Sequence, residues 1–139
     1  MNGPTVEGRP MPRPDNVSAH FWKSVAGGKL LVQKCPHCEH AQFYPRALCT
    51  ACGADPEWLE AAGTGKVHTF TVIRQNGMKP FVADVPYVVA IIELPEGVKM
   101  MGNVTDCAPE TVRVGMDVSW YPVTVNDEIG LPFWRPVNR

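Results

Sequence analysis

The sequence predicts a mainly β fold with a metal-binding module near its N-terminal end. Two observations carry this prediction: a pair of C-x-x-C motifs between residues 35 and 52, and an alternating pattern of apolar residues and turns from residue 63 onward. The first predicts an N-terminal helix and a rubredoxin-like zinc ribbon over residues 15–62. The second predicts a five-stranded OB-fold barrel over residues 63–139. Residues 1–14 are expected to form a flexible, proline-rich arm.

The four cysteines of the two motifs are the strongest signal in the chain. Each C-x-x-C pair is a tight turn that directs two thiolates to one point, and four thiolates in a tetrahedron suit a zinc ion. The pairs are Cys35 with Cys38 and Cys49 with Cys52. Because four thiolates leave no open coordination position, we expect one structural zinc ion per chain. His37 and His40 flank Cys38 and are expected to lie outside the coordination sphere.

A short helix ending at Ala26 is expected before the zinc ribbon, with Asp15 or Asn16 as its cap. The helix carries Phe21 and Trp22 side by side. Adjacent residues point about 100° apart on a helix, so these two rings cannot share one narrow buried stripe. Part of this aromatic surface is therefore expected to pack beyond the helix. The sequence leaves open whether it packs against the chain's own core or against a partner protein.

Short apolar or alternating runs predict the strands of both parts. They are Lys29–Lys34, Ala41–Tyr44, Lys66–Gln75, Tyr87–Leu94, Val98–Val104, Asp117–Val125 and Phe133–Val137. Between ribbon and barrel, Ala54–Ala62 is expected to be a connector anchored by Trp58. Strict alternation in the first barrel strand places Val67, Thr69, Thr71 and Ile73 on one face. Five strands with a long first connection are the outline of an OB barrel.

Composition argues against several classes of protein. The chain has 139 residues with 13 basic and 14 acidic side chains, whereas a nucleic-acid-binding protein usually shows a basic excess. The longest apolar run has strand length, so no membrane span is expected. The N-terminal residues lack the apolar core of a secretory signal. Five cysteines at this spacing suit a reduced, cytoplasmic metalloprotein better than a disulfide framework.

Candidates for catalysis are weak. Cys107 has no histidine near it in the sequence, and His68 lies within an alternating strand where a structural role is expected. No serine stands in an elbow motif, and neither a glycine-rich phosphate loop nor a paired-carboxylate signature is present. By its residues alone, the chain does not look like a self-sufficient enzyme.

Several short motifs follow one another in a fixed order over nearly the whole chain. They are Cys35-Pro-His-Cys38, Phe43-Tyr-Pro-Arg46, Cys49-Thr-Ala-Cys52, Gly63-Thr-Gly65-Lys66-Val67 and Leu131-Pro-Phe-Trp-Arg-Pro136. In this order, over about residues 16–137, the sequence resembles the zinc-ribbon/OB-fold proteins that accompany thiolase-superfamily enzymes acting on acyl-CoA.

The resemblance implies a non-catalytic accessory subunit in a hetero-oligomer with a thiolase-fold catalytic subunit. That partner would be a thiolase or a side-chain-cleaving aldolase, and it would carry the catalytic cysteine and histidines. The accessory chain would assist complex assembly and contribute to the channel that binds acyl-CoA. Other relatives serve acyltransferases or hydratase-like domains. If the phosphates of coenzyme A contact this chain, Arg46, Arg74 and Lys79 are the candidate cations.

Two other functions remain open from the sequence. Zinc ribbons and OB barrels also occur in single-stranded nucleic-acid-binding modules, where bases stack on aromatic side chains. The available aromatics are Phe70, Trp120, Tyr121, Phe133 and Trp134, although core packing of a small barrel accounts for most of them. The third possibility is a free-standing thioesterase or hydratase.

Overall fold

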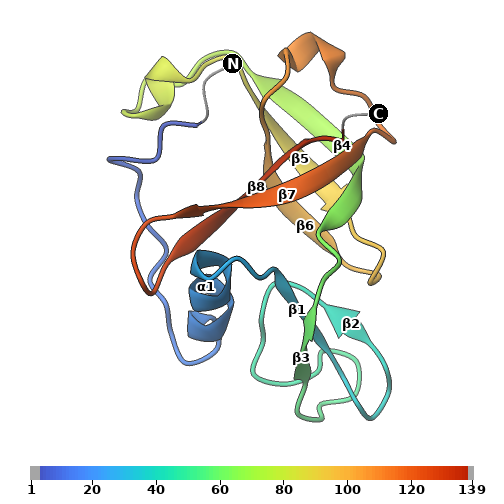
Figure 1. Ribbon diagram of the computed structural model, residues 1–139. Coiled ribbons are helices and arrows are strands. Elements are labelled where there is room, and N and C mark those ends of the chain that lie inside the picture. Colours follow the sequence, from blue (N-terminus) through green and yellow to red (C-terminus); the bar gives the residue numbers. More distant parts are fainter. Residues whose placement is uncertain (1–3, 138–139) are drawn as a thin grey trace.

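The computed structural model describes residues 4–137 and confirms the expected fold class (Figure 1). A single α-helix precedes a small sheet and a closed five-stranded barrel in this part of the chain. The elements are α1 Ala19–Ala26, β1 Leu31–Lys34, β2 Ala41–Gln42, β3 Glu57–Glu60, β4 Thr64–Ile73, β5 Tyr87–Glu93, β6 Lys99–Val104, β7 Asp117–Thr124 and β8 Gly130–Pro136, with single 3-10 turns at η1 Phe81–Ala83 and η2 Pro109–Thr111.

The zinc-ribbon part is a three-stranded antiparallel sheet in the order β2-β1-β3. Strand β3 lies within the segment expected to be a connector, so that expectation was wrong. Four residues are too few for alternation to reveal a strand, and β3 forms because β1 offers it a free edge. Trp58 lies opposite Gln33 and packs against the core, as an anchor should.

The barrel closes in the order β4-β5-β6-β8-β7. All its neighbours run antiparallel except β6 and β8, which meet in parallel where Val104 pairs with Trp134. Strand β8 begins at Gly130, earlier than expected, because Gly130 pairs with Thr124 in a hairpin with β7. The interrupted link between the third and fourth barrel strands contains the single turn η2.

A β-bulge changes the buried face of β4. The pairing of β4 with β5 shifts register between Val67 and Thr69. An extra residue at a bulge moves every later side chain to the opposite face. Val67 is therefore buried, whereas farther along the strand Phe70 and Val72, not Thr69, pack against the core. The strict alternation expected for this strand was wrong for this reason.

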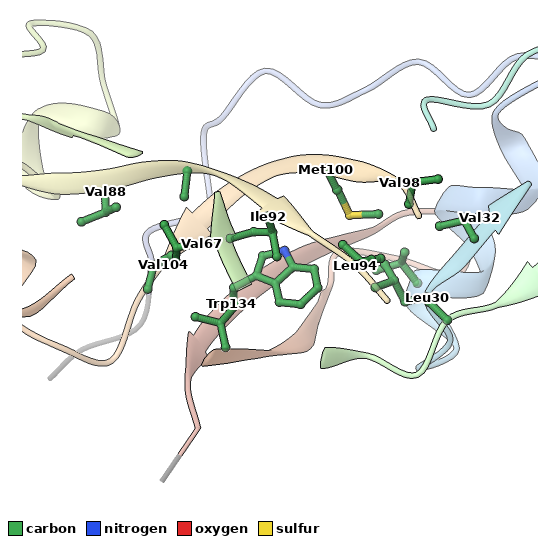
Figure 2. Packing of buried hydrophobic residues seen from close by; sticks show 14 of the residues in the cluster. Leu30, Val32, Val67, Val88, Ile92, Leu94, Val98, Met100, Val104 and Trp134 are labelled. Carbon is green, nitrogen blue, oxygen red and sulfur yellow. The ribbon is translucent and has the colours of Figure 1, made fainter. Parts of the chain in front are cut away.

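One hydrophobic core runs from the ribbon into the barrel (Figure 2). Trp134 is fully buried in the barrel, where it lies beside Ile92. At the junction, Leu94 lies close to Leu30, so residues from the two parts share one buried cluster. Because the core is continuous, the ribbon is fixed relative to the barrel and to the hairpin between β5 and β6.

Helix α1 packs directly on the barrel. A Cβ atom added at Gly130 would lie 2.3 Å from the backbone nitrogen of Ala26, so only glycine fits where β8 begins. Thr124 also donates a hydrogen bond from its Oγ1 to the Ala26 carbonyl, at 3.1 Å. The helix begins at Ala19, later than expected, because Asp15 instead accepts hydrogen bonds from the backbone amides of the turn before it. None of the helices within residues 4–137 has the length and apolarity needed to cross a membrane.

Candidate functional site

The four cysteines of the ribbon converge as a tetrahedral metal site requires. All four Sγ atoms lie within 4.8 Å of one another. The Sγ atoms of Cys35 and Cys52 are 3.5 Å apart, and those of Cys38 and Cys49 are 3.6 Å apart. Zinc–sulfur bonds of about 2.3 Å in a tetrahedron require sulfurs roughly 3.8 Å apart. The donor set and its spacing therefore fit one metal ion with thiolate ligands.

The two C-x-x-C turns have the same backbone hydrogen bonds. The amide of Cys35 donates to the His40 carbonyl at 2.9 Å, and the amide of Cys49 donates to the Ala54 carbonyl at 2.7 Å. In each turn the residue after the second cysteine donates back to the carbonyl of the first, at 2.9 Å. These two residues, Glu39 and Gly53, both have a left-handed backbone, with φ of 65° and 81°. Each turn thus directs its two sulfurs inward in the same way.

Crowding of the four thiols separates their pKa values. Burial raises the pKa of Cys49, but the backbone amides of Cys52 and Ala51 donate to its sulfur and bring the pKa down to about 6. The amide of Ala54 lowers the pKa of Cys52, but desolvation and the neighbouring cysteines outweigh it and raise the pKa to about 12. Four thiolates so close together repel one another, and a divalent cation at their centre removes that repulsion.

Two buried glutamines hold the loop between the cysteine pairs. Gln33 and Gln42 face each other across β1 and β2, and the Gln42 amide donates to Gln33 Oε1 at 2.9 Å. Gln33 also accepts from the Arg46 backbone amide at 2.9 Å and donates to the Arg46 carbonyl at 3.0 Å. Gln42 accepts from the Thr50 amide at 2.9 Å and donates to the Leu48 carbonyl at 3.2 Å. The loop that carries Arg46 is therefore fixed by buried polar groups.

A polar cleft lies between this loop and the hairpin that joins β5 to β6. We call it the ribbon cleft; its volume is about 390 Å³ and it is lined by His40, Ala41, Gln42, Phe43, Tyr44, Arg46, Thr50, Gly97, Val98 and Lys99. Three of these residues, His40, Arg46 and Lys99, are basic, and none is acidic. Glu96, next to the lining in sequence, instead accepts a hydrogen bond from the Ala62 amide at 3.0 Å.

The three basic residues of the ribbon cleft have no acidic partner among the described residues. Neither Arg46 nor Lys99 forms an ion pair there, and His40 contacts the Thr50 hydroxyl at 3.1 Å. On the barrel, Lys66 pairs with Asp117 at 2.5 Å and Arg135 with Asp106 at 3.6 Å, whereas Arg74, Lys79 and Arg113 form no ion pair within residues 4–137. The ribbon cleft is therefore locally electropositive in a chain of net charge −1.

The structure separates the three cations that the sequence suggested for phosphate binding. Arg46 lines the ribbon cleft. Arg74 directly follows β4 and Lys79 lies in the next loop, which Figure 1 shows at the end of the barrel away from the ribbon. Arg46 is instead joined by Lys99 and His40, which the sequence did not suggest for this role.

A wide apolar groove adjoins the ribbon cleft. It has a volume of about 610 Å³ and runs past the exposed edge of α1, the ribbon loop and barrel strands β5, β6 and β8. Its lining comprises Arg9, Phe21, Trp22, Phe43, Tyr44, Phe81, Tyr87, Val89, Met100, Met101, Gly102, Asn103, Leu131, Pro132 and Phe133. Phe43 and Tyr44 line both the groove and the cleft, and on the opposite wall β6 passes from Lys99 to Met101. The two hollows therefore lie side by side and share the wall formed by Phe43 and Tyr44.

The aromatic pair of the helix forms one wall of this groove. Phe21 is buried, whereas Trp22 is half-buried and donates from its Nε1 to the Tyr44 hydroxyl at 3.3 Å. The rings of Phe21 and Phe43 lie 5.2 Å apart. Of the two interpretations left open by the sequence, packing against the chain's own residues accounts for Phe21 and for one side of Trp22.

The N-terminal arm contributes Arg9 to the lining of the groove. Thr5 donates from its backbone amide and its hydroxyl to the carboxylate of Asp84, at 3.0 and 2.7 Å. The Arg9 guanidinium lies 3.6 Å from the same carboxylate and 4.8 Å from the Phe81 ring centroid. The charge of Arg9 is thus balanced, in contrast to the cations of the ribbon cleft.

The weak catalytic candidates stay apart in the structure. Cys107 is half-buried after β6 and packs against the core, and His68 is exposed with its Nδ1 3.8 Å from the Glu93 carboxylate. The aromatic side chains suggested for base stacking are mostly taken up by the barrel core. Phe133 and Trp134 are buried, and Phe70 and Trp120 pack against the buried cluster.

Comparison with known protein families assigns both parts of the chain. Residues 22–57 match the family model described as the ChsH2 rubredoxin-like zinc ribbon domain, and residues 58–121 match the ChsH2 C-terminal OB-fold domain. A DUF35 domain-containing scaffold protein of Methanocaldococcus jannaschii is 35% identical over 107 residues, which are 75% of this chain and 75% of that protein. The chain belongs to the ChsH2/DUF35 family.

Two further comparisons place this DUF35 protein among relatives with named activities. A probable enoyl-CoA hydratase alpha subunit of Thermomonospora curvata is 33% identical over 129 residues, 92% of this chain. The chain spans only 40% of the length of that relative. A solved structure described as Ltp2-ChsH2(DUF35) aldolase contains a chain that superimposes with a TM-score of 0.80 and 32% identity, covering 90% of this chain and 98% of that one.

Proposed function

We propose that this DUF35 protein is a non-catalytic accessory subunit that binds a thiolase-superfamily enzyme acting on acyl-CoA. The single observation that carries this proposal is the superposition, over 98% of its length, of the matched chain in the structure described as Ltp2-ChsH2(DUF35) aldolase. The two chains share 32% of their aligned residues and superimpose with a TM-score of 0.80, so the likeness extends to the sequence as well as to the fold. A partner that makes or breaks a carbon–carbon bond would supply the catalytic cysteine and histidines.

One zinc ion per chain belongs to this proposal. Cys35, Cys38, Cys49 and Cys52 would hold it, and the ion would supply a structural crosslink with no open coordination position. The two turns bring the sulfurs to one point. The buried glutamine pair fixes the adjoining loop, because Gln33 accepts a hydrogen bond from the Arg46 backbone amide. The role of the ribbon in the complex is therefore to present a rigid surface beside the barrel.

The apolar groove supports the idea of a partner. A wide apolar groove with two large exposed side chains on its walls is a common feature of protein–protein docking surfaces. Met101 is 67% exposed and Tyr44 is 42% exposed on its walls. A catalytic subunit docked along the groove would cover these side chains and close a channel between the two proteins.

The test is reconstitution. This chain is co-expressed with a candidate thiolase-superfamily protein and passed over a size-exclusion column. We expect co-elution, and carbon–carbon cleavage or formation on acyl-CoA that depends on both proteins. Separate elution, together with partner activity that is unchanged when this chain is omitted, would contradict the proposal. The Cys35→Ser variant is the control for the contribution of the zinc ribbon, because it lacks one metal ligand while the barrel sequence is unchanged.

A hydratase partner is the second candidate. It is favoured by the match of 92% of this chain to the Thermomonospora curvata hydratase alpha subunit. The same reconstitution distinguishes the two partners: hydration of an enoyl-CoA indicates the hydratase, and retro-aldol or thiolytic cleavage of a β-hydroxy- or β-ketoacyl-CoA indicates a thiolase-superfamily enzyme.

A further inference from the structure

We propose that the free edge of strand β3 is a docking site for an extended segment of a partner protein, in which two apolar residues are flanked by basic ones. The inference rests on the proposed function, because that function supplies the partner. Strand β3 is an outer strand of the ribbon sheet, whose order is β2-β1-β3 (Figure 1). A segment that pairs with β3 would extend this sheet by one strand.

The backbone of β3 has one row of hydrogen-bonding groups that face away from β1. The amide of Ala61 donates to the Leu30 carbonyl at 2.8 Å, so this pair just beyond the strand is hydrogen-bonded. Antiparallel partners alternate between hydrogen-bonded and non-hydrogen-bonded pairs, so Leu59 also faces β1, whereas Trp58 and Glu60 face outward. Within residues 4–137, no strand, turn or side chain pairs with the outward backbone groups of these two residues.

The free edge is short. Ala62 follows Glu60 in the alternation, and its amide already donates to Glu96 Oε2 at 3.0 Å. At the other end, Pro56 has no amide hydrogen to offer. The free amides and carbonyls of Trp58 and Glu60 suffice to align a strand of about four residues, and side chains must supply the rest of the affinity.

The side chains of β3 specify the sequence of the docked segment. Alternate residues of a strand point to opposite faces, so Trp58 and Glu60 share one face and Glu57 and Leu59 the other. Each face therefore presents one apolar and one acidic side chain. Apolar pairs and opposite charges stabilise neighbouring strands when they lie side by side. The complement of acidic–apolar–apolar–acidic is basic–apolar–apolar–basic, and this pattern is the same for parallel and antiparallel pairing.

The acidic side chains of this edge are available to a basic segment. Glu57, Glu60 and the preceding Asp55 are exposed, and none of them forms an ion pair within residues 4–137. Lys34 lies opposite Glu57 on β1 without forming an ion pair with it. A second copy of β3 would place glutamates against these glutamates, and like charges directly opposite destabilise strand pairing. The charges thus favour a basic partner over self-association.

The edge is held in place before a partner arrives. All four residues of β3 pair with β1, and Trp58 and Leu59 pack against the buried cluster. From helix α1, the His20 ring lies 5.2 Å from the Trp58 ring. A preformed edge loses less entropy on binding than a flexible one. No residue of β3 lines the ribbon cleft or the apolar groove, so a partner can use this edge while those hollows are filled.

The first test is an amide NMR titration of the intact, zinc-loaded chain with the blocked peptide Thr-Lys-Val-Val-Lys-Thr at millimolar concentrations. We expect shift changes and slower hydrogen exchange at the amides of Trp58 and Glu60. The peptide Thr-Glu-Val-Val-Glu-Thr should bind at least about tenfold more weakly, because each exposed opposite-charge pair contributes a factor of roughly two to five. Equal binding of the two peptides, or no change at these two amides, overturns the proposal.

Two sets of variants separate charge from backbone pairing. Glu57→Gln combined with Glu60→Gln should weaken binding of the lysine peptide about tenfold. Glu110→Gln combined with Glu128→Gln, at exposed positions outside the ribbon, should leave binding unchanged. Glu60→Pro removes one outward amide hydrogen, which an edge strand tolerates, and should bind more weakly than Glu60→Gln. Unchanged exchange protection of the β1 amides verifies that the variants are folded. Equal affinities of Glu60→Pro and Glu60→Gln would overturn strand pairing.

The reconstituted complex separates failure of this inference from failure of the proposed function. Hydrogen exchange over residues 57–60 is measured with and without the catalytic subunit. A gain in protection supports the docking site. An active complex without that gain overturns the docking site and leaves the proposed function standing. If no complex forms, the proposed function fails, and the peptide titration alone decides the docking site.

Discussion

The ribbon and the barrel are stabilised by different kinds of interaction, although they share a core. The ribbon is organised by directional groups: four cysteines around one point and two buried glutamines that bind the backbone of the loop. The barrel is organised by burial, with Trp134 fully enclosed and five strands closed on themselves. Directional bonds place a loop at a set position, whereas apolar burial tolerates small shifts.

This difference explains where the candidate binding surface lies. The ribbon cleft has one wall from each part: the loop of Arg46, placed by polar bonds, and Lys99, placed by the barrel hairpin. A cleft built from two such walls keeps its shape only while both are intact. Breaking either kind of interaction by itself therefore tests the comparison.

Removal of the metal is the largest expected effect. Chelation of the zinc-loaded protein, or the Cys35→Ser change, leaves thiolates that repel one another, and folding of the ribbon depends on the bound ion. We expect backbone amides between Cys35 and Cys52 to lose hydrogen-exchange protection, whereas β5 and β6 keep theirs. Equal loss of protection in both parts would show that the shared core makes them one cooperative unit and would break the contrast drawn above.

Truncation of Trp134 is expected to have the next largest effect, and it acts on the barrel. Trp134→Ala should lower the free energy of unfolding by about 3–5 kcal/mol, because a large cavity is left in the core. Trp134→Phe should cost much less, since the Nε1 of Trp134 has no hydrogen-bond partner among the described residues. Denaturant unfolding of the zinc-loaded protein measures both values. Equal costs for the two variants would contradict this expectation, because a phenylalanine ring should fill most of the cavity that alanine leaves.

A smaller loss is expected where the helix meets the barrel. Gly130→Ala would place a Cβ atom 2.3 Å from the Ala26 nitrogen, and separating the helix from β8 should cost about 1–3 kcal/mol. Gly77→Ala is the matched control, because nothing lies within 4 Å of its added Cβ and its backbone is not left-handed. Thermal unfolding measures both; an unchanged melting temperature for Gly130→Ala would mean that α1 is not seated on β8.

The parts of the fold that depend on local sequence could be predicted. The C-x-x-C spacing alone predicts that two sulfurs lie close together, and the apolar runs in the sequence predict strands β5 and β6. The bulge after Val67 was missed, although the apolar spacing changes there from Val67 to Phe70 and Val72, because strict alternation was assumed along the whole strand. Strand β3 was missed because only its pairing with β1 makes it a strand.

The candidate site shows the same limit more sharply. Arg46 was proposed from the motif around it, whereas Lys99 reaches the same cleft only through the folding of the β5–β6 hairpin against the ribbon. Arg74 and Lys79 were suggested because they lie near the long first barrel loop, which is at the end of the barrel away from the ribbon, and their contact with phosphates stays a prediction. Packing of the shared core brings together residues that are far apart in the sequence, and a local sequence pattern does not predict such contacts.

The smallest effect is expected within the ribbon, where the two cysteine turns differ at one position. Glu39 and Gly53 occupy equivalent left-handed positions, which cost a residue with a Cβ atom roughly 1 kcal/mol relative to glycine. Glu39→Gly should therefore stabilise the zinc-loaded ribbon slightly, and Gly53→Ala should destabilise it by about 1 kcal/mol. Competition with a coloured zinc chelator measures both, because ribbon folding and metal affinity are coupled. If the two substitutions shift the affinity in the same direction, the turns are not equivalent, and the inward direction of the four sulfurs does not come from a repeated backbone geometry.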